Sequence, residues 1–135
     1  MDKFLNTAVE YLKKFINPHQ LKTMIDGTKG EEGQFFREKL LETYVLILSM
    51  PATYETDGDD KATYQLHYFR GGCDWWIKEK DKEDRQLQAF GYACLSDPQN
   101  AELGYINIEE LLYNRVELDL YWTPCTLDRI KKGDL

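Results

Sequence analysis

The run Asp57-Gly58-Asp59-Asp60 is the first candidate for chemistry in this sequence, because clustered carboxylates are typical ligands of a calcium ion. A calcium-binding loop needs further oxygen ligands at fixed offsets and a glutamate near its twelfth position. Counted from Asp57, the fifth position is Lys61 and the twelfth is Tyr68, and neither side chain is suitable. We therefore expect a polar turn here, with no metal and no other cofactor.

His67 is the candidate general base. It lies within YQLHYF (64–69), a run rich in β-forming residues, and the alternation of a strand places its side chain opposite Leu66 and Tyr68. The other histidine, His19, is distant in the sequence, and no metal-binding spacing includes either of them. Catalytic triads are assembled in space rather than in sequence, so a general base stays one alternative. The favoured alternative is a hydrogen-bonded histidine within a sheet.

The cysteines, Cys73, Cys94 and Cys125, are odd in number and have no C-x-x-C spacing. This pattern argues against a disulfide framework and against a thiolate zinc site. The first fifteen residues mix charged and apolar side chains, which is not typical of a secretory signal, and the longest apolar run is too short to span a bilayer. We expect a reduced, cytoplasmic protein with free thiols.

Motifs that would identify an enzyme are missing from the sequence. It has no phosphate-binding glycine loop, no nucleophile elbow, no HExxH and no zinc-finger spacing. The pair Gly71-Gly72 is followed by neither a helical pattern nor a lysine. The sequence therefore names no catalytic residue and favours a non-enzymatic protein.

Aromatic residues are concentrated in the second part of the chain. They are Tyr64, Tyr68, Phe69, Trp75, Trp76, Phe90, Tyr92, Tyr105, Tyr121 and Trp122. Consecutive residues of a strand point to opposite faces of the sheet, so one of Trp75 and Trp76 should pack under the helices. The other should remain for solvent or for a partner. Core packing explains most of the set, and an exposed aromatic stripe for a partner is the alternative.

Negative charge is unevenly distributed. The 135 residues include 24 acidic and 17 basic ones, for a net charge of −7. Residues 1–54 are neutral overall, whereas residues 55–119 have a net charge of −8. A chain this acidic is a poor candidate for binding the phosphate backbone of a nucleic acid. Its carboxylates serve either solubility at turns and edges or an electronegative face for a basic partner.

The first 54 residues have helical periodicity. An amphipathic helix of about fourteen residues should bury Phe4, Ala8, Leu12 and Phe15. Asn17-Pro18 should end it and cap a second, short helix. A third helix should span 34–50 and is apolar on more than one side, so we expect the first helix to cover one of these sides. Residues 1–26 are then an integral part of the core.

From Tyr64 onward the periodicity is that of strands. Residues 64–69 and 73–80 should form an antiparallel hairpin, and two further strands should follow within 86–106. Asn107 should cap a short helix, and a last helix should close the chain. We therefore predict an α+β fold, with N-terminal helices packed on a mainly antiparallel sheet of four to five strands and short C-terminal helices. The chain should be a single domain, 1–135, with a helical part, 1–54, and a sheet part, 55–135.

Several segments, taken together in their order along the chain, match the pattern of a known protein family. They are MPATYETDG (50–58), LHYFRGGCDWWIKEKD (66–81), QLQAFGYACL (86–95), AELGYINIEELL (101–112) and VELDLYWTPCTLDRI (116–130). Over roughly residues 35–131 the chain resembles a bacterial family of domains of unknown function carried by conjugative plasmids, integrative elements and phages. The resemblance brings no activity, cofactor or catalytic residue. It implies an accessory gene on mobile DNA. Such genes often inhibit host defence by restriction or CRISPR interference, or assist plasmid maintenance.

The leading hypothesis is a non-enzymatic, acidic interaction protein of a mobile genetic element. It would be an anti-defence inhibitor, anti-CRISPR or anti-restriction, that binds a basic surface of a host nucleic-acid-processing protein or ribonucleoprotein in the bacterial cytoplasm. We expect no direct nucleic-acid binding and no membrane, and we keep a homodimer as an alternative. The expected partner-binding residues are Asp57, Asp59, Asp60, Trp75, Trp76, Glu79, Asp81, Glu83 and Asp84.

The alternative hypothesis is a small enzyme or ligand-binding module. Its pocket would lie between the sheet and the N-terminal helices around His67, with Tyr68, Trp75 and Glu79 in the lining. A cavity that contains His67 beside a carboxylate would favour it. A third hypothesis is single-strand binding through aromatic residues on the sheet, which the negative charge of this part disfavours.

Overall fold

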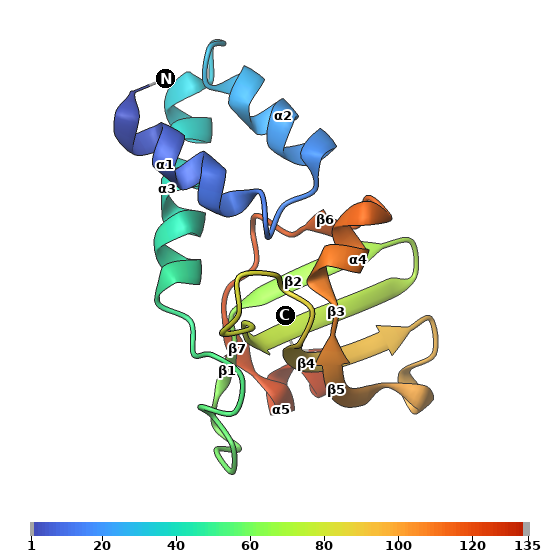
Figure 1. Cartoon of the computed structure of the whole chain (residues 1–135). Coiled ribbons are helices and arrows are strands. Elements are labelled where there is room, and N and C mark those ends of the chain that lie inside the picture. Colours follow the sequence, from blue (N-terminus) through green and yellow to red (C-terminus); the bar gives the residue numbers. More distant parts are fainter. Residues whose placement is uncertain (1, 134–135) are drawn as a thin grey trace.

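Three helices form the N-terminal part of the chain: α1 (Lys3–Leu12), α2 (Pro18–Gly27) and α3 (Gly33–Leu48). The computed structural model describes residues 2–133. In Figure 1, α1 and α2 lie above the sheet that the rest of the chain forms, and α3 runs down beside it. Within the described part, no helix is both long and apolar enough to cross a membrane.

The starts of the first two helices are set by side-chain caps. The Asp2 carboxylate accepts a hydrogen bond from the Leu5 amide at 2.8 Å, and the Asn17 side chain accepts one from the Gln20 amide at 2.9 Å. Pro18 occupies the first turn of α2, where its missing N–H costs nothing. The predicted role of Asn17-Pro18 is confirmed.

The main sheet has five antiparallel strands in the order β5-β4-β3-β2-β6. These are β2 (Leu66–Arg70), β3 (Cys73–Glu79), β4 (Ala89–Leu95), β5 (Glu102–Ile106) and β6 (Glu117–Leu118). Two short strands, β1 (Thr63–Tyr64) and β7 (Cys125–Thr126), pair separately. A 3₁₀ turn, η1 (Pro98–Asn100), and two short helices, α4 (Ile108–Tyr113) and α5 (Leu127–Lys132), complete the chain. The predicted α+β fold is confirmed.

The register of the β2–β3 hairpin determines which side chains lie on each face. His67 pairs with Trp76, and Tyr68 pairs with Trp75, so neighbouring cross-strand pairs point to opposite faces. We call the face that carries Tyr68 and Trp75 the inner face, because it packs against the core of the N-terminal helices. The outer face carries His67 and Trp76 and is partly covered by α5. Figure 1 shows α5 on the side of the sheet away from α1, α2 and α3.

A main core joins the N-terminal helices to the inner face and to α4. It includes the fully buried Leu12, Phe15, Tyr68 and Ile77. The Tyr68 hydroxyl donates a hydrogen bond of 2.5 Å to the Phe15 carbonyl, and burial raises the pKa of this phenol far above its ordinary value. The chain after α1 is therefore attached to the centre of the sheet by packing and by one buried hydrogen bond.

The apolar stripe of α1 is displaced by one residue from the predicted one. Leu5, Ala8, Val9 and Leu12 are buried, whereas Phe4 is 58% exposed and contacts Tyr44 only with an edge-to-face geometry. The prediction for Phe4 is wrong. The predicted and the observed apolar stripes both contain Ala8 and Leu12, so the spacing of the residues fits either stripe. The orientation of α1 against α3 determines which stripe is buried. The prediction that residues 1–26 contribute to the core is confirmed for Ala8, Leu12 and Phe15.

We expect Leu12→Ala to lower the free energy of unfolding by about 2–5 kcal/mol, because it leaves a cavity in a fully packed site. The matched change Phe4→Ala removes one edge contact and should cost only about 0.5–1.5 kcal/mol. Urea denaturation followed by circular dichroism measures both. Equal losses for the two variants would contradict the placement of α1.

Candidate functional site

Two of the predicted partner-binding carboxylates are buried. Glu79 is only 2% exposed, and it accepts hydrogen bonds from the backbone amides of Tyr54 at 2.8 Å and Thr56 at 3.0 Å and from the Thr56 hydroxyl. The prediction that Glu79 binds a partner is therefore wrong. The register of β3 against β4 shifts between Ile77 and Glu79, so Glu79 pairs with Phe90 and does not continue the alternation of Trp75 and Ile77. A buried carboxylate must accept hydrogen bonds from the chain around it.

Asp81 has a similar structural role in the next loop. Its carboxylate accepts hydrogen bonds of 3.0 Å from the backbone amides of Glu83 and Gln88. It is also buried, so its predicted role in partner binding is wrong as well. Asp81 thus closes the turn 82–88, as Glu79 closes the turn 54–56.

These two loops are attached to each other and to α3. The Thr53 hydroxyl lies 2.8 Å from the Gln88 carbonyl and 3.2 Å from the Lys80 carbonyl. The Lys80 ammonium donates to the carbonyls of Ile47 and Leu48, at 2.7 and 3.1 Å, where α3 ends. Cations at the C-terminal end of a helix satisfy its last carbonyls. These hydrogen bonds therefore hold the two loops in place relative to each other and to the end of α3.

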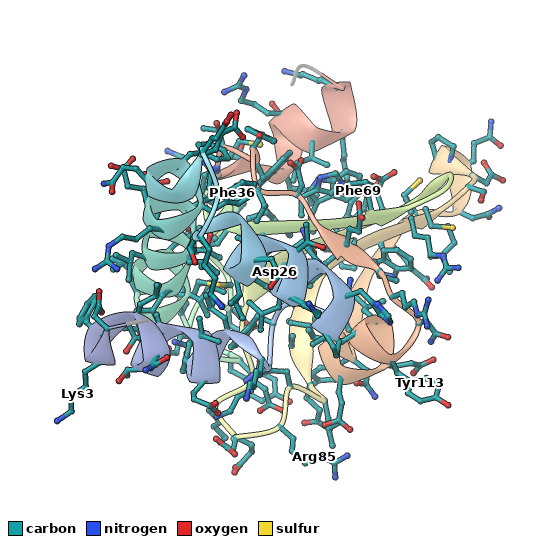
Figure 2. The ribbon with its side chains drawn as sticks, turned by 90° about the horizontal axis from the view of Figure 1, so that it is seen from above. Lys3, Asp26, Phe36, Phe69, Arg85 and Tyr113 are labelled. Carbon is teal, nitrogen blue, oxygen red and sulfur yellow. The ribbon has the colours of Figure 1, made fainter. Side chains whose placement is uncertain are left out.

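The remaining predicted acids are exposed but not equivalent. Asp84 forms an ion pair with Lys14, just after α1, and Glu83 is exposed beside it. Asp57, Asp59 and Asp60 are exposed in the turn 57–60, and within the described residues they form no ion pair. Arg85, in the turn 82–88, pairs with Glu109, and Figure 2 shows it at the edge of the molecule. The acidic turn, Asp57 to Asp60, is therefore the part of the predicted set that stays open to a partner.

An exposed aromatic group lies beside the acidic turn. Tyr54 and Tyr105 are 57% and 52% exposed, their hydroxyls are hydrogen-bonded, and their rings meet edge to face at 6.4 Å. The Phe90 ring contacts Tyr105 at 5.9 Å and an interplanar angle of 89°. The hydrogen bond to Tyr54 is the main cause that raises the pKa of Tyr105, followed by burial and by negative charges that include Asp57. We call Tyr54, Phe90 and Tyr105 the tyrosine cluster.

The tryptophans do not provide the expected exposed anchor. Trp75 and Trp76 point to opposite faces, as predicted, and Trp75 packs against the main core. Trp76 is only 9% exposed, because it lies in a second buried cluster with Ile130 of α5 and the His67 ring stacks on it. Its indole nitrogen has no hydrogen-bond partner within the described residues. The sequence could not indicate that a short C-terminal helix would return to this face, so the tyrosine cluster replaces Trp75 and Trp76 as the exposed aromatic group.

His67 is held between two carboxylates on the outer face. Its Nδ1 lies 2.9 Å from Asp119 Oδ2, and its Nε2 lies 2.7 Å from Asp74 Oδ1. The ring stacks on Trp76 at 5.1 Å with an interplanar angle of 13°, and Trp122 lies 5.2 Å away. The interpretation as a hydrogen-bonded sheet histidine is confirmed. Both ring nitrogens are thus occupied by carboxylate oxygens.

A pocket of about 550 Å³ contains His67 beside a carboxylate, but not in the predicted place. It is lined by His67, Asp119, Tyr121, Trp122, Thr123, Cys125 and Arg129. Of the other predicted lining residues, Tyr68 and Trp75 belong to the inner face, and the Glu79 carboxylate is bonded to the amides of Tyr54 and Thr56. Figure 2 shows Phe69, two residues after His67, on the side of the strands where α5 lies. The pocket is therefore bounded by the C-terminal segment and not by the N-terminal helices.

We expect Glu79→Gln to destabilise the protein by about 1–3 kcal/mol, because one amide oxygen cannot accept all the hydrogen bonds that the carboxylate accepts, and buried donors remain unsatisfied. The control Glu83→Gln changes an exposed side chain of a neighbouring loop and should stay within about 0.5 kcal/mol. Chemical denaturation measures both. Wild-type stability of Glu79→Gln would contradict its anchoring role.

We expect His67→Gln to cost about 1–3 kcal/mol as well, since a glutamine amide has a single nitrogen and cannot donate to Asp74 and Asp119 across the same span. His19→Gln, at an exposed position of α2, is the control and should leave stability within about 0.5 kcal/mol. Near-ultraviolet circular dichroism should change for His67→Gln alone, because the ring stacks on Trp76. An unchanged spectrum together with unchanged stability would refute the arrangement.

Comparison of this chain with protein-family models, with curated proteins and with solved structures finds no match. The resemblance over residues 35–131 to a family carried by mobile elements therefore stays a prediction. The arguments that follow rest on the geometry of the chain itself.

Proposed function

We propose that this protein is a non-enzymatic binding protein that uses the tyrosine cluster and the adjacent acidic turn to bind a basic protein surface. The observation that carries the proposal is the pair Tyr54 and Tyr105, two large aromatic side chains that are exposed, in contact and next to exposed carboxylates. Exposed tyrosines at the centre of a polar rim are typical of the energetic centre of protein interfaces.

The two kinds of side chain attract the same chemistry. The face of a tyrosine ring attracts lysine and arginine cations, and within the chain Lys78 already lies 5.4 Å from the centroid of Phe90. Carboxylates such as Asp57, Asp59 and Asp60 attract the same cations at longer range and accelerate association. A partner that presents arginine and lysine side chains can therefore be attracted by the acidic turn and then held by the aromatic rings.

The surface is also held in place before binding. The Tyr54 backbone amide donates to the buried Glu79, and the Tyr54 hydroxyl is bonded to Tyr105 of β5. A loop that is already ordered loses less conformational entropy when it binds. Glu79, which the sequence placed in the interface, thus supports the interface from behind.

The resemblance to a mobile-element family suggests the biological context of this binding. Restriction nucleases and CRISPR complexes bind phosphate backbones, which requires grooves lined with lysine and arginine. In this proposal the partner is such a host complex in the bacterial cytoplasm, and the protein opposes it by occupying a basic groove. The protein itself binds no nucleic acid, because its exposed carboxylates repel phosphate.

The test uses the triple variant Asp57→Lys, Asp59→Lys, Asp60→Lys and the single variant Tyr105→Ala. We expect both to lose a partner that the wild type captures from a bacterial lysate, and Tyr105→Ala to weaken the isolated complex by about 2 kcal/mol, the usual effect of an aromatic residue at the centre of an interface. The double variant Glu31→Lys, Glu32→Lys alters exposed acids between α2 and α3 and is the control. Identical partners for all variants, identified by quantitative mass spectrometry, would refute the proposed surface.

The anti-defence role is tested separately in cells. We expect the wild type to raise the plating efficiency of a phage on hosts that carry an active restriction or CRISPR system, and the triple variant to have no such effect. No rise with the wild type, while the partner is still captured, would remove the anti-defence role and keep the binding function.

A further inference from the structure

The two edges of the main sheet differ in what covers them. The edge strands are β5 and β6, and Figure 1 shows β6 next to the N-terminal helices and β5 on the far side of the sheet. The Gln20 side-chain amide donates to the Leu118 carbonyl at 2.8 Å and accepts from the Leu118 N–H at 2.9 Å. Asn17 donates to the Val116 carbonyl at 3.0 Å. Side chains of the N-terminal part thus occupy the place that a further strand would take beside β6.

The edge at β5 is open. Within the described residues, the backbone N–H and C=O groups of 102–106 have no hydrogen-bond partner outside β4. Successive residues of an antiparallel strand direct these groups alternately to either side, so part of those of β5 face solvent. Leu103 is exposed, and no other part of the described chain lies within 4 Å of the position that a Cβ on Gly104 would occupy. An uncovered strand edge of this kind can pair with another chain.

The tyrosine cluster lies beside this open edge and does not close it. The Tyr54 amide is bonded to Glu79 at the end of β3, and β4 lies between β3 and β5. The Tyr54 side chain therefore approaches Tyr105 from the side of β4. Tyr105 and Leu103 are two residues apart and point to the same face of β5. A strand added to β5 would place alternate side chains next to these two residues.

The charge around this edge favours a basic strand. Residues 86–114 contain no lysine, arginine or histidine, and their acids are Asp97, Glu102, Glu109 and Glu110. Glu109 pairs with Arg85, whereas Glu102 is exposed on β5 itself and forms no ion pair within the described residues. Like charges on neighbouring strands destabilise their pairing. A second copy of this chain, with its net charge of −7, is therefore disfavoured as the occupant, and a basic segment is attracted.

The aromatic rings next to the edge are still available to a cation. On the outer face, Lys78 and Lys131 lie over the rings of Phe90 and Tyr92, at 5.4 and 5.7 Å from their centroids. Both of these rings belong to β4. No lysine of the described residues lies over the ring of Tyr105. An arginine or lysine of an added strand can therefore take this position over β5.

We propose that the basic partner adds an extended segment to β5 as a further strand of the main sheet, with its arginine or lysine side chains next to Tyr105 and the acidic turn. The proposal rests on the proposed function and describes how that partner is held. Main-chain hydrogen bonds to β5 supply affinity, and the alternate basic side chains supply specificity.

The test uses the unmodified protein and a capped peptide of alternating arginine and valine residues, long enough to cover β5. We expect saturable binding by isothermal titration calorimetry. Hydrogen exchange followed by nuclear magnetic resonance should slow at the β5 amides that exchange fast in the free protein. The same peptide with two adjacent central amides N-methylated keeps its side chains and charge but loses hydrogen bonds on both edges, and it should bind about tenfold more weakly. A peptide with glutamate in place of arginine should not bind.

Three results would overturn strand addition: no binding of the arginine–valine peptide, unchanged exchange at β5, or equal affinity of the N-methylated peptide. Slow exchange of all β5 amides in the free protein, together with a dimer in analytical ultracentrifugation, would make a second copy the occupant and would also overturn it. Peptide binding that the triple variant of the acidic turn weakens, while exchange at β5 stays unchanged, would refute strand addition alone and leave the proposed function standing.

Exposed glutamates on the two edge strands provide matched variants that locate the site. Glu102 lies on the open edge strand β5, and Glu117 lies on β6, whose edge Gln20 closes. Glu102→Lys should lower the affinity for the arginine–valine peptide about fivefold, because it replaces an attraction with a repulsion. Glu117→Lys makes the same change of charge and should leave the affinity unchanged. Equal effects of the two variants would contradict binding at β5.

Discussion

The alternation of side chains along the β2–β3 hairpin is the constraint on which the rest of the structure depends. The pair Tyr68–Trp75 points toward the N-terminal helices, and the adjacent pair His67–Trp76 points to the outer face. A shift of one residue in this register would move every side chain to the other face. It would place His67 in the main core and Tyr68 beneath α5. Both cores and the pocket beside His67 therefore depend on one hydrogen-bonding register.

The acidic residues of this part of the chain have two different roles. The register of β3 shifts just before Glu79, and the buried Glu79 carboxylate closes a loop. Asp57, Asp59 and Asp60 lie in the turn that follows that loop, and they face solvent. Negative charge near the end of β3 thus has a structural component and a surface component. Only the surface component can attract a basic partner, and the structural component determines where it is presented.

The outer face shows how a small C-terminal element can create a site. The helix α5 has only six residues, yet it covers Trp76 with Ile130 and brings Arg129 to the edge of the His67 pocket. The segment 119–126 crosses beside β2, is held to it through His67 and Asp119, and returns to pair with β1. The rings of the pocket are therefore supported by residues that are distant in the sequence, and its geometry depends on the His67 contacts.

The sequence by itself determined what depends on local periodicity. It indicated the helices, the hairpin, the cap at Asn17, the opposite orientation of Trp75 and Trp76, and a hydrogen-bonded His67, because each follows from neighbouring residues. Tertiary structure decided which apolar stripe of α1 is buried, that Glu79 and Asp81 are anchors, and that Tyr54 meets Tyr105. These outcomes depend on the approach of segments far apart in the chain, and the spacing of residues within one segment does not contain that information.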